Sequence, residues 1–180
     1  MAEIDISQLE AFKDSLSKRA DWNDFVEANA RELAARFLRK VIKRTPVGDG
    51  TFEYEPGNKE LQRLTNGGTL RRGWTVKTEE EAAGGRAPSA MAHAATLKIS
   101  KRGRNYAVTL VNPCHYASYV EYGHRQTPGR FVPAIGKRLK KSWVRGQFMM
   151  TKSAKELNKE APKVIQIRLD AYLREVLNGK

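Results

Sequence analysis

Few residues of this 180-residue chain have the types and spacing of a catalytic or metal site. Cys114 and His115 are adjacent, whereas a cysteine nucleophile needs a histidine within hydrogen-bond reach, and neighbours on an extended segment point apart. One cysteine and three histidines provide few ligands for a metal site. The sequence therefore predicts a protein that is not an enzyme and needs no metal or cofactor.

Carboxylates and glycines add no catalytic pattern. The run Glu79-Glu80-Glu81 is typical of a solvated loop, and Asp49 and Glu53 lack a second motif that would complete an acid–base site. Gly84-Gly85 lacks the spaced glycines and the lysine of a phosphate-binding loop. These stretches therefore support the same non-enzymatic interpretation.

Basic residues dominate the charge. Thirty-three lysines and arginines against twenty acidic residues give a net charge of +13, which attracts polyanions. Two clusters are candidates for contact with DNA or with an acidic partner: Lys101, Arg102, Arg104, Lys137, Arg138, Lys140 and Lys141. Tyr106 and Trp143 lie near these clusters and could stack on bases. Charge alone does not separate a DNA contact from packing against an acidic protein ring.

The first half of the chain should begin with helices. Apolar spacing predicts a short helix over Asp5–Lys18 and a longer one from an N-cap at Asp21 to Arg44. Thr45-Pro46 should end it, because the residue before proline avoids the α region. Residues 48–68 have little periodicity and are predicted to form a long surface loop.

Strands should follow. Alternation of Leu70, Trp74 and Val76 predicts a strand over Thr69–Thr78, and Glu79–Ser89 is expected to be a mobile loop. A hairpin should then join residues 95–100 to residues 106–110 through a turn at 102–104.

The last third should return to helix. Tyr116–Tyr122 is predicted as a short helix or tight turn stopped by Gly123, and His124–Gly136 as a loop. Residues 148–161 have helical composition, and Pro162 either kinks that helix or opens a second one, which should end at Asn178-Gly179.

These elements predict one α+β domain with N-terminal helices, a small antiparallel sheet with a hairpin, and C-terminal helices. Its expected parts are residues 1–44 (helices), 45–68 (loop insertion), 69–112 (sheet region), 113–147 (short helix and loops) and 148–177 (helices). No run approaches the roughly 18 apolar residues of a membrane span, and the N-terminus lacks the order of a signal peptide, so we expect no membrane contact.

Four motifs, in order along the chain, resemble the tail-completion, or neck, family of tailed bacteriophages and phage-like prophage elements. They are Thr45-Pro46-Val47, Gly68-Thr69-Leu70-Arg71-Arg72-Gly73-Trp74, Tyr116–Gly123 and Trp143–Met149. The last resembles the branch found with contractile tails. Residues 48–67 separate the first two motifs more widely than is usual in the family.

The resemblance implies an α+β structural protein of the virion neck that completes the tail and helps join it to the head. It would form a ring, typically a hexamer, assemble in the host cytoplasm, and contact connector, stopper, terminator, tube or sheath proteins. Non-specific contact with DNA in the channel is also possible in this interpretation. The alternative is a cytosolic nucleic-acid-binding protein without an assembly role.

Ring contacts between unlike surfaces would use charged and aromatic residues. The candidate interface residues are Arg71, Arg72, Tyr116, Glu121, Tyr122, His124 and Arg125. Tyr116–Gly123 could instead be mainly structural, with Tyr119 and Val120 in the core and Gly123 a helix stop. Glu121 is then the member that we expect to be exposed.

Overall fold

The computed structural model describes residues 11, 14–16, 20–48, 52–54, 61–63, 67–103, 105–132 and 137–178. Its helices are α2 (Ala20–Arg44), α3 (Thr69–Arg72), α4 (Glu79–Ala83), α5 (Ala90–Thr96), α6 (Ala117–Tyr122) and α7 (Met149–Leu177), with a 3-10 helix, η1, at Gly73–Thr75. Its strands are β1 (Phe52–Tyr54), β2 (Leu61–Arg63), β3 (Ile99–Arg102), β4 (Asn105–Val108), β5 (Gly123–Arg125), β6 (Phe131–Val132), β7 (Lys137–Arg138) and β8 (Trp143–Arg145). The predicted α+β class is confirmed.

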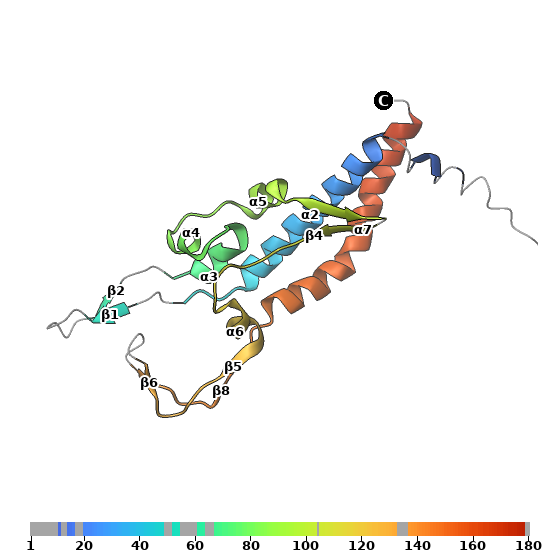
Figure 1. Cartoon of the computed structure of the whole chain (residues 1–180). Helices are drawn as coiled ribbons and strands as arrows, with labels where there is room; N and C mark the ends of the chain where they lie inside the picture. Colours follow the sequence, from blue (N-terminus) through green and yellow to red (C-terminus); the bar gives the residue numbers. More distant parts are fainter. Residues whose placement is uncertain are drawn as a thin grey trace, which may run out of the picture.

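Helix α2 is the central element of the body (Figure 1). It begins at Ala20, so Asp21 lies in its first turn and not at the predicted N-cap. Leu38 and Val41 are fully buried and face the rest of the core. The predicted end is confirmed, because Thr45 follows Arg44 and its hydroxyl donates to the Val41 carbonyl at 2.7 Å. Residues 11 and 14–16 are helical, and the rest of the predicted helix Asp5–Lys18 lies outside the described residues.

Helix α7 packs along α2 and runs through Pro162 as one element. Its axis changes direction near the middle, as expected where a proline removes a backbone donor (Figure 1). Tyr172 stacks on Phe25 with ring centroids 4.5 Å apart. The Lys40 ammonium lies 2.7 Å from Glu156 and 2.8 Å from Glu160, so apolar and ionic contacts both join the two helices.

The predicted strand over Thr69–Thr78 is wrong, because this segment forms α3 and η1. Leu70 and Trp74 are four residues apart, a spacing that shares one helical face as well as one strand face, and both are buried. The predicted loop over Glu79–Ser89 is wrong in its first half, which forms α4. Thr78 caps α4 by accepting from the Glu81 amide at 3.2 Å.

Antiparallel pairs of strands make up the β structure. The predicted hairpin is confirmed as β3 and β4, although α5 occupies residues 90–96 and shortens its first strand. Strands β1 and β2 pair within the predicted loop 48–68, which is therefore not structureless. The described strands form four separate two-stranded pairs. Of the helices described, none is both long and apolar enough to cross a bilayer.

Candidate assembly surface

Residues 123–132 and 137–145 form a two-stranded ribbon that extends away from the helical body (Figure 1). At its base β5 pairs with β8, with Arg125 opposite Trp143. The pairing continues through a hydrogen bond of 2.8 Å from the Gln126 amide to the Ser142 carbonyl, and farther out β6 pairs with β7. The predicted loop over His124–Gly136 is therefore wrong at residues 124–125 and 131–132, which belong to β5 and β6, whereas residues 126–130 between them are not strand.

A bulge interrupts the ribbon where Gly129 and Arg130 face Leu139. The Gly129 amide donates to the Leu139 carbonyl at 2.8 Å, and the Leu139 amide donates to the Arg130 carbonyl at 2.9 Å. Gly129 has φ +83°, and the Arg130 amide donates to Thr127, which makes Thr127-Pro128-Gly129-Arg130 a turn with glycine at the position that needs positive φ. Such a bulge increases the local twist of the ribbon.

Glu121 fixes the base of the ribbon to the body. Its side chain is only 3% exposed, and it accepts from the Met150 amide at 2.9 Å and from the Thr151 amide at 3.0 Å. The Thr151 hydroxyl also donates to it at 2.8 Å. The carboxylate thus satisfies free amides in the first turn of α7, where negative charge is also favoured by the helix dipole. The expectation that Glu121 is exposed is wrong.

Two glycines allow the strands to approach closely at this base. A Cβ on Gly123, which has φ +87°, would lie 2.4 Å from the Val144 carbonyl oxygen. A Cβ on Gly146 would lie 2.3 Å from the Glu121 carbonyl oxygen. The predicted helix stop at Gly123 is confirmed, and the same residue also makes room for β8.

The ribbon concentrates positive charge. It contains no Asp or Glu, and its seven basic residues are all exposed: Arg125, Arg130, Lys137, Arg138, Lys140, Lys141 and Arg145. Arg130 was not among the sequence candidates. The absence of any acidic residue between Glu121 and Arg145 is the signal that would have identified it.

Exposed aromatic rings accompany this charge. Trp143 on the ribbon is 51% exposed and Tyr122 at its base is 63% exposed. Tyr119 is also exposed, so the expectation that it packs in the core is wrong, whereas Val120 does pack against the core. Among the other candidates, Tyr116 and His124 are half-buried.

Arg71 and Arg72 hold parts of the body together. Arg71 donates twice to the Thr45 carbonyl, at 3.1 and 2.7 Å, and Trp74 donates to the Thr45 hydroxyl at 2.8 Å. Arg72 donates to the carbonyls of Ala82 at 2.6 Å and Gly67 at 3.1 Å. The Thr-Pro turn and the Leu-Arg-Arg-Gly-Trp segment therefore form one hydrogen-bonded unit at the end of α2.

The Cys114-His115 pair does not have the geometry of a nucleophile and its base. Cys114 is buried, which raises the pKa of its thiol, so its role as a small core residue is confirmed. Burial also raises the pKa of the neighbouring Tyr116 to about 12. His115 is directed to Glu79, with Nδ1 3.0 Å from the carboxylate, and this contact lowers the pKa of Glu79.

The basic cluster of the β3–β4 hairpin is in a different setting. Lys101 donates to the Asn23 side chain at 2.8 Å, and Tyr106 donates to the same oxygen at 2.6 Å. Lys101 is thus held against α2, while Arg102 is exposed and Arg104 lies outside the described residues. Figure 1 places this hairpin and the ribbon at opposite ends of the body.

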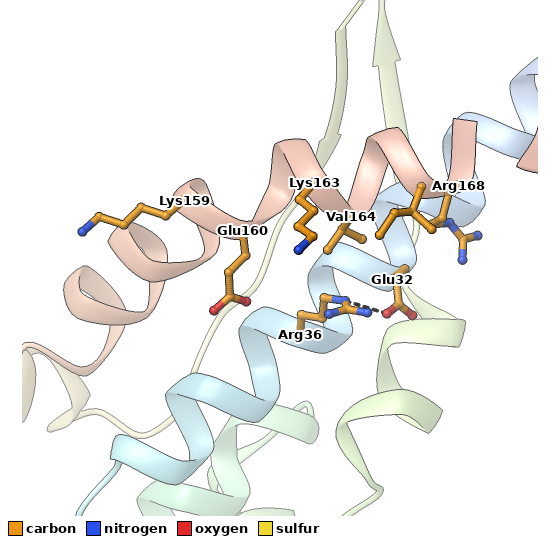
Figure 2. Close-up of a pocket in the computed structure, with 8 residues that line it drawn as sticks. Glu32, Arg36, Lys159, Glu160, Lys163, Val164 and Arg168 are labelled. Atoms are coloured by element: carbon orange, nitrogen blue, oxygen red, sulfur yellow. Dashed lines mark hydrogen bonds and ion pairs between the residues drawn. The ribbon is translucent and has the colours of Figure 1, made fainter. Parts of the chain in front are cut away.

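A groove of about 490 Å³ lies between α2 and α7 (Figure 2). Several of its charged side chains bind neighbours: Arg36 contacts Glu32 at 2.7 Å, and Arg168 donates to Asn29 at 2.7 Å. Val164 and Ile167 supply its apolar lining. Across the described ranges no group of three potential metal ligands occurs here or elsewhere. This mixed lining is that of a protein surface and contains no acid–base or nucleophilic constellation.

Comparison with protein families decides the affiliation of the chain. Residues 7–123 match the family model described as "Bacteriophage HK97-gp10, putative tail-component". The chain belongs to the HK97-gp10-like family of phage tail components. No curated protein and no solved structure matches it.

The HK97-gp10-like match ends at Gly123, where the ribbon begins. It includes the motifs at Thr45, Gly68–Trp74 and Tyr116–Gly123, which form the hydrogen-bonded unit at the end of α2 and the base of the ribbon. The resemblance first seen in these motifs is therefore confirmed. The ribbon, α7 and Trp143–Met149 lie beyond the matched residues, so the assignment to a contractile tail stays a prediction.

Proposed function

We propose that this HK97-gp10-like protein is a non-enzymatic structural component of the phage neck. It completes the tail and joins it to the head as one subunit of a ring, for which six copies are the expected number. Its partners are the connector or stopper on one side and terminator, tube or sheath proteins on the other. A contractile tail remains part of the proposal on the strength of Trp143–Met149 alone.

The observation that carries the proposal is the anchored ribbon with exposed rings at its base. The Trp143 ring lies against Gly123, 3.2 Å from the position that a Cβ on Gly123 would take. Tyr122 directly precedes Gly123 in the chain. Half-exposed aromatic side chains are characteristic of interface centres, because they bury much area at little entropic cost. Closed rings need two unlike surfaces, and the ribbon differs in shape and charge from the α2–α7 side.

Within this proposal, Tyr122, Arg125 and Trp143 contact the neighbouring subunit, and Tyr116 and His124 support them from half-buried positions. Arg71, Arg72 and Glu121, which also stood as interface candidates, contribute indirectly by holding the body and the ribbon base in shape. The closed arrangement of backbone around Gly123 and Gly146 keeps the contact residues in place before assembly, which lowers the entropy lost on binding.

The test is complementation of a phage or prophage that lacks the gene. We expect the double variant Tyr122→Ser/Trp143→Ser to produce far fewer joined particles than the wild-type chain, although it folds normally. The matched control is Met91→Ser, which removes a similarly exposed apolar side chain (51%) on α5. Normal yields of joined particles with the double variant would contradict the assignment of the ring contact to the ribbon base.

A further inference from the structure

We propose that the outer half of the ribbon binds the phosphate backbone of double-stranded DNA without reading sequence. The DNA-binding residues are Lys137, Arg138, Lys140 and Lys141. The biological source of the DNA rests on the proposed neck location, since DNA must pass the junction between head and tail. The binding itself is a property of the isolated chain.

Free positive charge is the first argument. All four side chains are exposed, and within the described part of the chain none of them takes part in an ion pair. Arg138 donates one hydrogen bond, to the Gly129 carbonyl at 2.8 Å, which orients its guanidinium without neutralising it. Because the ribbon contains no Asp or Glu, its field is not cancelled locally.

Basic side chains in other regions of the molecule already bind neighbouring residues. Lys101 of the β3–β4 hairpin is held by Asn23 and lies 5.3 Å above the Tyr106 ring. Between α2 and α7, Lys40 and Arg44 are paired with Glu156. The ribbon is therefore where uncompensated charge can meet a polyanion.

Shape is the second argument. A two-stranded antiparallel ribbon fits the major groove of B-DNA, which is about 12 Å wide. The turn at Thr127–Arg130 shortens the arm from Gly123 to Val132, so at roughly 3.4 Å per extended residue it reaches about 25 Å, or about three quarters of one turn of duplex. The fixed base at Gly123 and Gly146 allows this arm to be presented without first becoming ordered.

Composition favours nucleic acid over an acidic protein. Protein interfaces are depleted in lysine and centre on apolar or aromatic side chains. The segment Lys137–Ser142 offers three lysines and one arginine around a single apolar residue, Leu139, which is half-buried. A row of flexible point charges suits phosphates spaced along a duplex.

The test is fluorescence anisotropy of the full chain with a labelled 30-base-pair duplex over a series of NaCl concentrations. The ribbon variant is Lys137→Gln/Arg138→Gln/Lys140→Gln/Lys141→Gln. Each phosphate contact contributes about one unit to the slope of log affinity against log salt, so we expect the slope to fall by about 3 to 4. Two duplexes of unrelated sequence should bind alike.

The matched control removes the same charges from exposed positions of α7: Lys155→Gln/Lys159→Gln/Lys163→Gln/Arg174→Gln. We expect this control to keep the wild-type slope. An unchanged slope in the ribbon variant would overturn the proposal and leave an acidic protein as the ribbon's partner. An equal loss in both variants would also overturn it, because net charge alone would then explain binding.

This measurement is independent of the proposed function. Loss of DNA binding in the ribbon variant would support the inference even if deletion of the gene left particles normally joined. Conversely, separated heads and tails after gene deletion would support the neck assignment even if the ribbon did not bind DNA. Circular dichroism and thermal melting are the folding controls, and we expect both variants to match the wild-type chain in each.

Discussion

Glu121 shows how one side chain can determine the geometry of a much larger element. Its carboxylate accepts hydrogen bonds from the amides of Met150 and Thr151 and so joins the end of α6 to the start of α7. The ribbon between these helices must leave the body at that point. The sequence alone predicts an exposed Glu121, because its hydrogen-bond donors are the amides of residues 150 and 151, about 30 residues farther along the chain.

We therefore expect Glu121→Ala to destabilise the chain by about 1–3 kcal/mol, because it leaves two partly buried amides of α7 without acceptors. Urea unfolding at pH 7 measures the change in the free energy of unfolding. The matched control is Glu80→Ala on α4, an exposed glutamate whose loss should change stability by less than about 0.5 kcal/mol. Equal effects of the two substitutions would show that Glu121 does not cap α7.

A second residue-scale prediction concerns the hydrogen-bonded unit around Thr45. Thr45→Val keeps the shape of the side chain but leaves the buried Trp74 indole N–H without its acceptor. We expect a loss of about 1–3 kcal/mol in the free energy of unfolding, measured by urea titration. Thr109→Val, at an exposed position after β4, is the control, and a similar cost there would contradict the account.

At the scale of elements, the periodicity of apolar residues predicts an element correctly where its contacts follow from local spacing. It does not predict an element whose pairing partner lies far away in the sequence. Helix α2, its stop at Thr45-Pro46, α6 and the β3–β4 hairpin could be predicted from local spacing. The segment 69–78 was assigned to the wrong element because Leu70 and Trp74 fit both periods. The capping pair Thr78 and Glu81 was a readable signal for α4 that the strand interpretation overlooked.

The ribbon could not be predicted in the same way. Its pairing joins residues 123–132 to residues 137–145, and single-strand patterns do not specify which distant strand a segment meets. Pro128-Gly129 lies in the predicted loop over His124–Gly136, but its turn forms a bulge within the ribbon. The expected division of the chain into parts around residues 113–147 stays a prediction.

Close backbone packing at the ribbon base leads to a prediction for Gly146. Gly146→Ala would place a methyl group 2.3 Å from the Glu121 carbonyl oxygen, so backbone must shift. We expect a loss of about 1–3 kcal/mol, as is typical of overpacking, together with faster proteolysis within the ribbon. Gly48→Ala has no neighbour within 4 Å and is the control. Wild-type stability of Gly146→Ala would refute the packing described.

The contact between α2 and α7 should depend on pH. Lys40 and Arg44 beside Glu156 hold the pKa of its carboxyl below the ordinary value. A depressed pKa gives stability that is present above the ordinary pKa of glutamate, about 4.3, and lost as pH falls through the lower folded value. Glu156→Gln should therefore be less stable than wild type at pH 7, and this difference should disappear at more acidic pH.

Urea unfolding of both chains at pH 7 and at pH 3 tests this dependence. The control is Glu175→Gln, which changes an exposed glutamate of α7 and should give the same small difference at both pH values. A difference between wild type and Glu156→Gln that persists unchanged at pH 3 would show that the ionised carboxylate is not its source.

At the scale of the whole molecule, a helical body built around α2 and α7 carries a long basic ribbon at one end (Figure 1). The family match covers residues 7–123, which include α2 to α6 and end where the ribbon starts, and leaves α7 outside. This arrangement fits a subunit that assembles through the ribbon base and presents positive charge beyond it.

The central claim is that this HK97-gp10-like chain joins tail to head. Electron microscopy of the particles made after deletion of its gene tests this claim most directly. The account predicts full heads and complete tails that remain separate, with joined particles restored by the wild-type chain. Normally joined particles in the absence of the gene would contradict it.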